Sequence, residues 1–557
     1  MNESLVRTLL LGEATAQITP KTHVLAGPWC LAGRAEEASE ADYAMPPEPL
    51  ADPEKLDMAV RQARQLAVDL APLVQAHLNT LYGVHHDAQY WDFVLAPWLG
   101  RVVEVLVDRL YRTEGLLHAF GGQALRVGVV PDTSVYAFAD TQDFIMNGIL
   151  SPQWNEWLFS RLLERDWPAN WEQTALSPLH RSAPVATTQH PLKRLARNLL
   201  FGLPFPRVKG FSTLQSLRLS LTLLQNRNTH DDTIPLRELS DAAWFAHTPP
   251  PAPLAPLPLG MTVDEACRLA LALLPRSLST ATIPARLTRT PSWFLKAPLI
   301  RTRVVSVAAC EDDAYRIRMA KHRGLGCRMV FIQHGGEYGF VRSSVAYPLV
   351  EYRQHRFITW GWQHHGDMPG NFLPLPHPQL ATLHTARADT TAVPGQHHET
   401  APQLLLVGTE MALLPYTLKS MLRGRQFFAY RQDKARFLTA LGDLRLQTLY
   451  RPYFDVPSSL EDAPWILRRF PEVTRCTGAL EPHLLGCRLL VLDHAGTTLA
   501  QALAANIPFL LYWNPDMVHF TPEALPLLEG LREVGILHDS PEAAAAHAVA
   551  IWNTVPT

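Results

Sequence analysis

Short apolar runs alternate with helical stretches throughout the second half of the sequence. The runs have the length of strands and occupy residues 304–309, 330–332, 356–362, 404–407, 445–450, 489–493 and 509–513. Strands that are buried on both faces of a parallel sheet read as nearly continuous apolar runs. Helical segments begin near Asp312, around Asp433 and after Ser540. This βαβ rhythm predicts an α/β protein with two Rossmann-like units.

The first part of the chain is less regular. Residues 22–27 (THVLAG) and 125–130 (LRVGVV) have the composition of short buried strands, and residues 57–84 carry helical periodicity. We therefore expect an α/β or largely helical N-terminal region. A chain of 557 residues exceeds what one hydrophobic core usually supports, so at least two domains are expected.

Two proline-containing segments divide the chain. Residues 247–259 (HTPPPAPLAPLPL) cannot continue a helix or a central strand and predict a stiff, extended connector. A second polar break, residues 373–403, precedes the apolar run at 404–407 and is interpreted as the interdomain linker. The predicted domains are therefore residues 1–372, with helical insertions, and residues 404–557.

Composition and charge narrow the class of protein. Apolar residues make up 47 % of the chain and the net charge is −2, which argues against a nucleic-acid-binding protein. The six cysteines show no CxxC or metal-finger spacing. No stretch reaches the roughly 18 apolar residues of a membrane-spanning helix, so we expect a cytoplasmic location.

One segment is locally basic. No Asp or Glu occurs between Gln173 and His230, whereas residues 181–227 contain eight arginines and lysines among apolar positions. Such a segment suits a surface helix that contacts anionic lipid headgroups or a lipid-linked acceptor at the inner face of the membrane. An ordinary amphipathic helix packed on the core would have the same pattern.

The sequence FIQHGGEYG, residues 331–339, is the first candidate for a functional site. A buried strand ends there in a loop, and ligands of open α/β sheets bind beyond the carboxyl ends of the strands. Gly335 and Gly336 permit close approach of a ligand. His334 and Glu337 flank the two glycines, where they can act on one acceptor hydroxyl as general base or as hydrogen-bonding anchors.

The sequence HAGTT, residues 494–498, is the second candidate. It joins a predicted strand to a predicted helix, so Gly496 and the amides and hydroxyls of Thr497 and Thr498 form a potential phosphate cradle. The alternative is that the threonines simply cap the helix. His494 either binds the same phosphate or is a buried structural histidine.

Further candidates lie at other strand and helix ends. Arg451 follows a predicted strand and either clamps a phosphate or pairs with Asp455. Asp312 either caps the next helix or acts on a sugar. Asn79 and Trp91 belong to a polar and aromatic cluster near a helix end that could shape the acceptor site. Trp360 and Trp362 could stack on a sugar or a base, or belong to the core.

The chain resembles the surface-carbohydrate biosynthesis transferases that occur in bacterial O-antigen and related loci and were first noticed in Leptospira. The resemblance runs through most of the chain and rests on motifs at residues 27–31, 78–79, 90–99, 151–158, 333–339, 357–362, 449–453, 495–515 and 534–552. These motifs are long and follow the order found in the family. Gln501 departs from the family pattern, because a glutamate typically stands there and often holds the donor ribose in GT-B enzymes.

The resemblance implies a GT-B-like glycosyltransferase that takes a nucleotide-activated sugar without an obligatory metal or other cofactor. It would build a surface glycan of the lipopolysaccharide O-antigen or capsule type, with residues 404–557 on the donor side and residues 1–372 on the acceptor side. The sequence leaves CMP, UDP and GDP open as the nucleotide. Two rival classes also remain open, a nucleotide-sugar epimerase and a polysaccharide-assembly protein that only binds.

Overall fold

The structure is a computed structural model that describes residues 6–14, 17–34, 43–181, 218, 255–279, 302–342, 344–366, 368–392, 403–452 and 456–555. Of the basic segment 181–227, only Arg181 and Arg218 lie among these residues. Most of the proline-rich segment 247–259 also lies outside them. None of the described helices is both long and apolar enough to cross a membrane.

The N-terminal sheet contains four parallel strands in the order β2-β1-β3-β5. These are β1 (Arg7–Leu10), β2 (His23–Leu25), β3 (Leu125–Val129) and β5 (Trp171–Ala175). The strands predicted at residues 22–27 and 125–130 are thus confirmed as β2 and β3. A separate pair is formed by β4 (Val135–Tyr136) and β6 (His180–Arg181).

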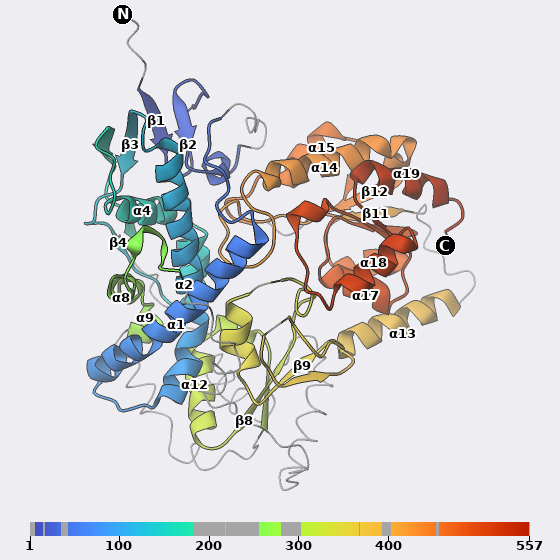
Figure 1. Ribbon diagram of the computed structural model, residues 1–557. Coiled ribbons are helices and arrows are strands. Elements are labelled where there is room, and N and C mark those ends of the chain that lie inside the picture. Colours follow the sequence, from blue (N-terminus) through green and yellow to red (C-terminus); the bar gives the residue numbers. More distant parts are fainter. Residues whose placement is uncertain are drawn as a thin grey trace, which may run out of the picture.

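Two long helices dominate this region, as Figure 1 shows in blue. Helix α1 (Pro53–Tyr82) confirms the predicted helical segment, and α2 (Ala88–Phe120) packs along it. Asp52 caps α1 by accepting from two backbone amides, and Gly83, with φ of 61°, ends it in the left-handed conformation that glycine adopts without strain. Shorter helices nearby are α3 (Thr141–Phe144), α4 (Pro152–Leu163), α8 (Val263–Ala272) and α9 (Arg276–Ser279).

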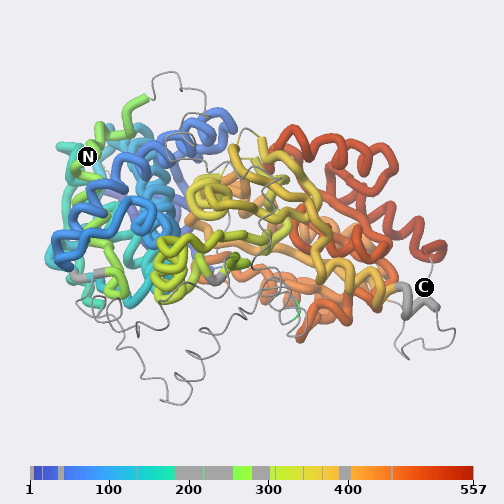
Figure 2. The backbone as a smooth tube through the Cα atoms, turned by 90° about the horizontal axis from the view of Figure 1, so that it is seen from below, coloured from blue at the N-terminus to red at the C-terminus, as the bar shows by residue number. Residues whose placement is uncertain are grey.

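The middle sheet has four parallel strands in the order β10-β9-β8-β7. Its members are β7 (Thr302–Val305), β8 (Arg328–Ile332), β9 (Arg356–Thr359) and β10 (Phe372–Pro374). The helices α11 (Ala308–Glu311) and α12 (Asp313–Gly324) connect β7 to β8. In Figure 2 the yellow part of this region lies between the blue N-terminal helices and the red C-terminal end.

The C-terminal sheet has six parallel strands in the order β13-β12-β11-β14-β15-β16. The strands are β11 (Leu404–Val407), β12 (Thr448–Arg451), β13 (Thr474–Arg475), β14 (Leu489–Leu492), β15 (Phe509–Tyr512) and β16 (Leu537–His538). Numbered from β11, this is the order 3-2-1-4-5-6 of a doubly wound Rossmann sheet. Every residue of β11, β14 and β15 is buried, which explains their continuous apolar sequences.

Six helices accompany this sheet: α14 (Gln426–Ala440), α15 (Asp462–Arg469), α16 (Leu480–Gly486), α17 (Thr497–Ala504), α18 (Leu525–Glu533) and α19 (Pro541–Ile551). The helix predicted after Ser540 is confirmed as α19, and the Ser540 hydroxyl caps it by accepting from the Ala543 amide at 3.3 Å. The predicted α/β class with parallel sheets is confirmed as well. The described part of the N-terminal half, however, contains two separate four-stranded parallel sheets and the two-stranded β4–β6 pair, where one Rossmann-like domain was expected.

The segment 373–403 is more structured than a plain linker. It contains the end of β10 and the helix α13 (Pro378–Ala392), which Figure 1 shows running from the middle sheet to the C-terminal sheet. Leu383 of α13 is fully buried against C-terminal residues that include Leu405 and Leu499. The limits of the two domains, 1–372 and 404–557, stay a prediction.

Candidate functional site

The two glycine-containing motifs lie against each other, although they belong to different sheets. The Gly336 amide, beyond the end of β8, donates to the hydroxyl of Thr497 at 3.0 Å. A Cβ on Gly336 would lie 2.5 Å from the Thr497 nitrogen, so a side chain there would collide with the backbone of α17. The two motifs therefore touch each other directly at this point.

The contact lies at the topological switch point of the C-terminal sheet. The central strands β11 and β14 pair in parallel, and the chain leaves them toward opposite halves of the sheet. The Thr409 amide, after β11, donates to Asp493, after β14, at 3.1 Å. Ligands of doubly wound sheets bind at this point, so the contact between Gly336 and Thr497 is well placed for a binding site.

His334 is partly accessible and has acidic and phenolic neighbours behind it. Its side chain is 20 % exposed, and its Nδ1 lies 3.4 Å from a carboxylate oxygen of Glu351. The Tyr338 hydroxyl lies 3.1 Å from the same nitrogen and donates to Glu351 at 2.7 Å. This histidine has the setting of a general acid or base.

Glu337 forms an ion pair with Lys419, which lies on the segment between β11 and α14. Burial raises the pKa of Glu337, but the Lys419 ammonium and, more weakly, His494 outweigh it, so the pKa is lowered. Burial alone would lower the pKa of Lys419, whereas Glu337 raises it above its usual value. Glu337 and Lys419 are therefore both charged at neutral pH.

His494 is held by the preceding aspartate. Its Nδ1 lies 2.9 Å from Asp493, whose side chain is fully buried. Because a carboxylate can only accept, Nδ1 carries the hydrogen and Nε2 is left for another partner. Lys434 lies 3.8 Å from the other Asp493 oxygen and pairs more closely with Asp462, at 2.5 Å. A Cβ on Gly496 would lie 3.0 Å from the His494 Nε2, which explains the glycine there.

Helix α17 begins without a capping side chain. Its N-cap is Gly496, and neither Thr497 nor Thr498 caps the helix. The capping interpretation of the two threonines is therefore not what the structure shows. Thr497 is exposed and Thr498 is buried, while Gln501 lies one turn further along the same face as Thr497. The helix N-terminus attracts anions through its backbone amides and dipole.

Two candidates lie further from this contact. Arg451 ends β12, and its guanidinium donates to the Cys476 carbonyl at 3.5 Å, toward the β13 edge of the sheet. Its alternative partner, Asp455, lies outside the described residues. Asp312 caps α12 by accepting from the Tyr315 amide at 2.9 Å. Burial raises the pKa of Asp140, and the charge of Asp312 contributes to this shift. The structure shows the capping alternative for Asp312, and its action on a sugar stays a prediction.

Asn79 and Trp91 hold the turn between α1 and α2 together. The Asn79 side chain donates to the His86 carbonyl at 3.1 Å and accepts from the Trp91 indole at 2.8 Å. Trp91 is only 2 % exposed. Both side chains thus hold the helical hairpin together, and their part in shaping the acceptor site stays a prediction.

Trp360 and Trp362 are anchored by Gln333. The Trp360 amide and the Trp362 indole both donate to its side-chain oxygen at 2.8 Å. The Trp360 ring lies 4.8 Å from that of His377, and the Trp362 ring lies 4.9 Å from that of Phe372. Each ring is half-buried, and the contacts favour the core alternative over stacking on a sugar.

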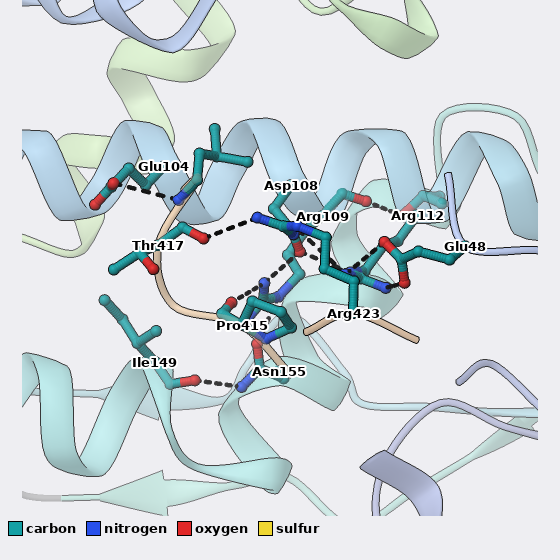
Figure 3. Close-up of polar contacts among 12 residues, drawn as sticks. Glu48, Glu104, Asp108, Arg109, Arg112, Ile149, Asn155, Pro415, Thr417 and Arg423 are labelled. Carbon is teal, nitrogen blue, oxygen red and sulfur yellow. Dashed lines mark hydrogen bonds and ion pairs between the residues drawn. The ribbon is translucent and has the colours of Figure 1, made fainter. Parts of the chain in front are cut away.

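A buried ion network anchors the segment that carries Lys419 (Figure 3). Asp108 of α2 pairs with Arg109 at 2.6 Å, Arg112 at 2.7 Å and Arg423 at 3.1 Å. Arg109 also donates to the Pro415 carbonyl at 2.7 Å. The N-terminal helices thus fix the position of residues 415–423, and with them Lys419 at the candidate site.

The described part of the chain shows no metal cluster, and an open groove lies elsewhere in the fold. Among the described residues, no group of three or more metal-ligating side chains occurs. An open groove with an empty volume of about 660 Å³ lies between α1, α2 and residues 348–352, where Leu99 and Arg353 help to line it. It shares no lining residue with the contact between Gly336 and Thr497.

Four residues near the site were missed from the sequence: Glu351, Lys419, Lys434 and Asp493. Asp493 could have been found, since it directly precedes HAGTT at a strand end. Lys419 and Lys434 follow β11 in segments without a recognisable motif. Glu351 lies in the short π-helix Pro348–Tyr352, a rare element that often marks functional sites but has no clear sequence signal.

Comparison with known proteins gives a family and a distant structural likeness. No curated protein matches the chain significantly. A solved α,α-trehalose-phosphate synthase (UDP-forming) from Burkholderia vietnamiensis is 12 % identical, with a TM-score of 0.29 over 51 % of this chain and 71 % of that one. The model of the LIC12162 family transferases matches residues 7–557. Since this match covers nearly the whole chain, the protein belongs to the LIC12162 family and is a transferase.

Proposed function

We propose that this transferase moves a sugar from a nucleotide-activated donor to a bacterial surface glycan of the lipopolysaccharide O-antigen or capsule type. The contact between Gly336 and Thr497 carries the proposal, because it gathers a histidine, an ion pair and a helix N-terminus at a switch point. Glycosyl transfer needs a base for the acceptor hydroxyl and stabilisation of the leaving phosphate. The resemblance to O-antigen-locus transferases supports the type of acceptor.

In this proposal the two sides of the contact have different roles. His334 takes the proton of the acceptor hydroxyl. The amides at the start of α17, the hydroxyls of Thr497 and Thr498, and His494 bind the donor phosphates. Lys419 adds positive charge beside them. A cytoplasmic location, with peripheral membrane contact through residues 181–227, belongs to the proposal because the acceptor is expected to be lipid-linked.

A transfer assay tests the reaction. CMP-, UDP- and GDP-sugars are incubated with the purified protein, with and without a lipid-linked or free glycan acceptor, and the products are identified by mass spectrometry. We expect nucleotide release and sugar incorporation with one donor class, and only with acceptor. Conversion of the free nucleotide sugar without acceptor would identify an epimerase. Tight glycan binding without turnover would identify an assembly protein.

The phosphate cradle can be tested by binding alone. Replacing Thr497 and Thr498 together by valine keeps their shape and removes both hydroxyls. Each lost hydrogen bond to a charged group is worth roughly 1.5–3 kcal/mol, so we expect the dissociation constant of the preferred nucleotide to rise well over tenfold. Isothermal titration measures this change.

Thermal unfolding of the same double variant provides the check on folding. The helix has a glycine N-cap, so the hydroxyls do not cap it, but Thr497→Val removes the acceptor of the Gly336 amide. We therefore expect a loss of stability of roughly 0.5–1.5 kcal/mol, the net worth of one hydrogen bond. Thr474→Val, an exposed change on β13, is the matched control and should alter neither quantity. Unchanged nucleotide affinity in the folded double variant would remove HAGTT from the proposed site.

A further inference from the structure

Glu351 is a buried acid directly behind His334. It is only 2 % exposed, and its Oε2 accepts from the Tyr338 hydroxyl at 2.7 Å. Its Oε1 has no hydrogen-bond partner among the described residues and lies 3.4 Å from the Nδ1 of His334. The His334 imidazole thus lies next to this oxygen.

The surroundings of Glu351 are mostly aromatic. The ring of Tyr338 stacks on that of Tyr347 at 4.0 Å and lies 6.5 Å from that of Tyr352. Burial, and then the Glu351 charge, raise the pKa of Tyr338 and of Tyr352 well above the usual value. A carboxylate in such a place costs free energy that an apolar side chain of similar volume would avoid. A role in stability alone does not account for it.

The hydrogen bond from Tyr338 to Glu351 limits how both side chains can interact with His334. Its hydroxyl hydrogen is donated to Glu351, so its oxygen can only accept from the imidazole. The Glu351 carboxylate likewise can only accept. The Tyr338 oxygen lies 3.1 Å from Nδ1 and 3.3 Å from Nε2 and so does not distinguish the two nitrogens, whereas Glu351 lies beside Nδ1. The carboxylate therefore favours a hydrogen on the Nδ1 of His334, which leaves the Nε2 lone pair as the base.

We infer that Glu351 is a positioning residue that holds His334 in the Nδ1–H tautomer, an inference that rests on the proposed function of His334 as the base. In the reaction, the acceptor hydroxyl proton moves to Nε2 while its oxygen bonds to the anomeric carbon. The bond from that carbon to the donor phosphate breaks, and the phosphate leaves with the electron pair. Glu351 stabilises the imidazolium that results.

Imidazole ¹⁵N chemical shifts test the tautomer without any substrate. The His334 signals in histidine-labelled protein are assigned by their loss in a His334→Gln variant. We expect the Nδ1–H pattern in the wild type. In Glu351→Gln the amide group can donate toward Nδ1, so we expect the Nε2–H pattern, whereas Glu351→Asp keeps a carboxylate and should retain Nδ1–H.

Kinetics then link the tautomer to the reaction. Glu351→Gln should lower kcat by roughly 10²-fold, the lower end of what a general base supplies, with KM unchanged. Glu529→Gln, at a side chain that is 60 % exposed, is the matched control. An unchanged tautomer in Glu351→Gln would overturn the inference. If Glu351→Gln does not fold, the tautomer of His334 is measured in Glu351→Asp and Tyr338→Phe instead. An Nε2–H pattern in the wild type would overturn the inference without any variant.

The two claims fail in different ways. If the tautomer changes as expected but the wild type transfers no sugar, the proposed function is wrong and the hydrogen-bonding role of Glu351 stands. If the wild type transfers sugar while Glu351→Gln keeps both its tautomer and its kcat, the proposed function stands and the role of Glu351 is wrong.

Discussion

Replacing Asp108 by asparagine is expected to lower the free energy of unfolding by about 3–5 kcal/mol, as removal of one partner from a buried ion network does. The side chain is 2 % exposed and binds three arginines, and an amide of the same shape cannot neutralise them. Urea denaturation followed by fluorescence measures the loss. Because Arg423 is a member of the network, the variant should also loosen the segment that carries Lys419 (Figure 3).

The control and the pH dependence make this expectation specific. Glu172 pairs with Arg126 at the surface, where it is 57 % exposed, and Glu172→Ala should cost less than about 1 kcal/mol. Burial raises the pKa of Asp108, but Arg112, Arg109 and Arg423 together lower it to about 2. Its contribution is therefore complete above the unfolded pKa near 3.9 and is lost as the pH falls toward about 2. Equal losses in both variants would contradict this account.

Replacing His334 by glutamine is expected to lower kcat by roughly 10²–10⁴-fold, the contribution of a general base. Glutamine has no basic nitrogen, but its amide can donate to Glu351 and so avoids leaving that acid without a partner. The partly exposed position of His334 should allow the variant to fold. Steady-state kinetics with the donor and acceptor found in the transfer assay measure the effect, with nucleotide binding as a second readout.

Nucleotide binding should survive this change within a few-fold, because His334 acts on the acceptor in our proposal. His118→Gln, at an exposed position near the end of α2, is the matched control and should have wild-type kinetics. A loss in kcat smaller than tenfold would exclude His334 as the base. A large loss of nucleotide affinity would instead place it on the donor side.

Local sequence patterns predicted the fold class and the two motifs that meet. The strand ends at FIQHGG and HAGTT were recognisable because buried strands, glycines and helix starts leave a signal within about ten residues of chain. The sheet order that places HAGTT at the switch point depends on pairing between strands far apart in the sequence. The βαβ rhythm predicted Rossmann-like units but not this order.

Contacts between distant segments were not predictable in this way. Lys419 reaches Glu337 across 82 residues of sequence, and the Gly336 amide reaches Thr497 across 161. Neither pair has a spacing that a single sequence reveals. The same holds for Asn79 and Trp91, because their hydrogen bond in the α1–α2 turn could not be inferred from their positions in the sequence.

A crystal structure of the protein with its preferred nucleoside diphosphate would test the central claim most directly. We predict that a phosphate oxygen lies within about 3 Å of the amide or hydroxyl of Thr497 or Thr498, with His494 and Lys419 beside it. Nucleotide phosphates bound elsewhere, for example in the groove between α1 and α2, would contradict the account.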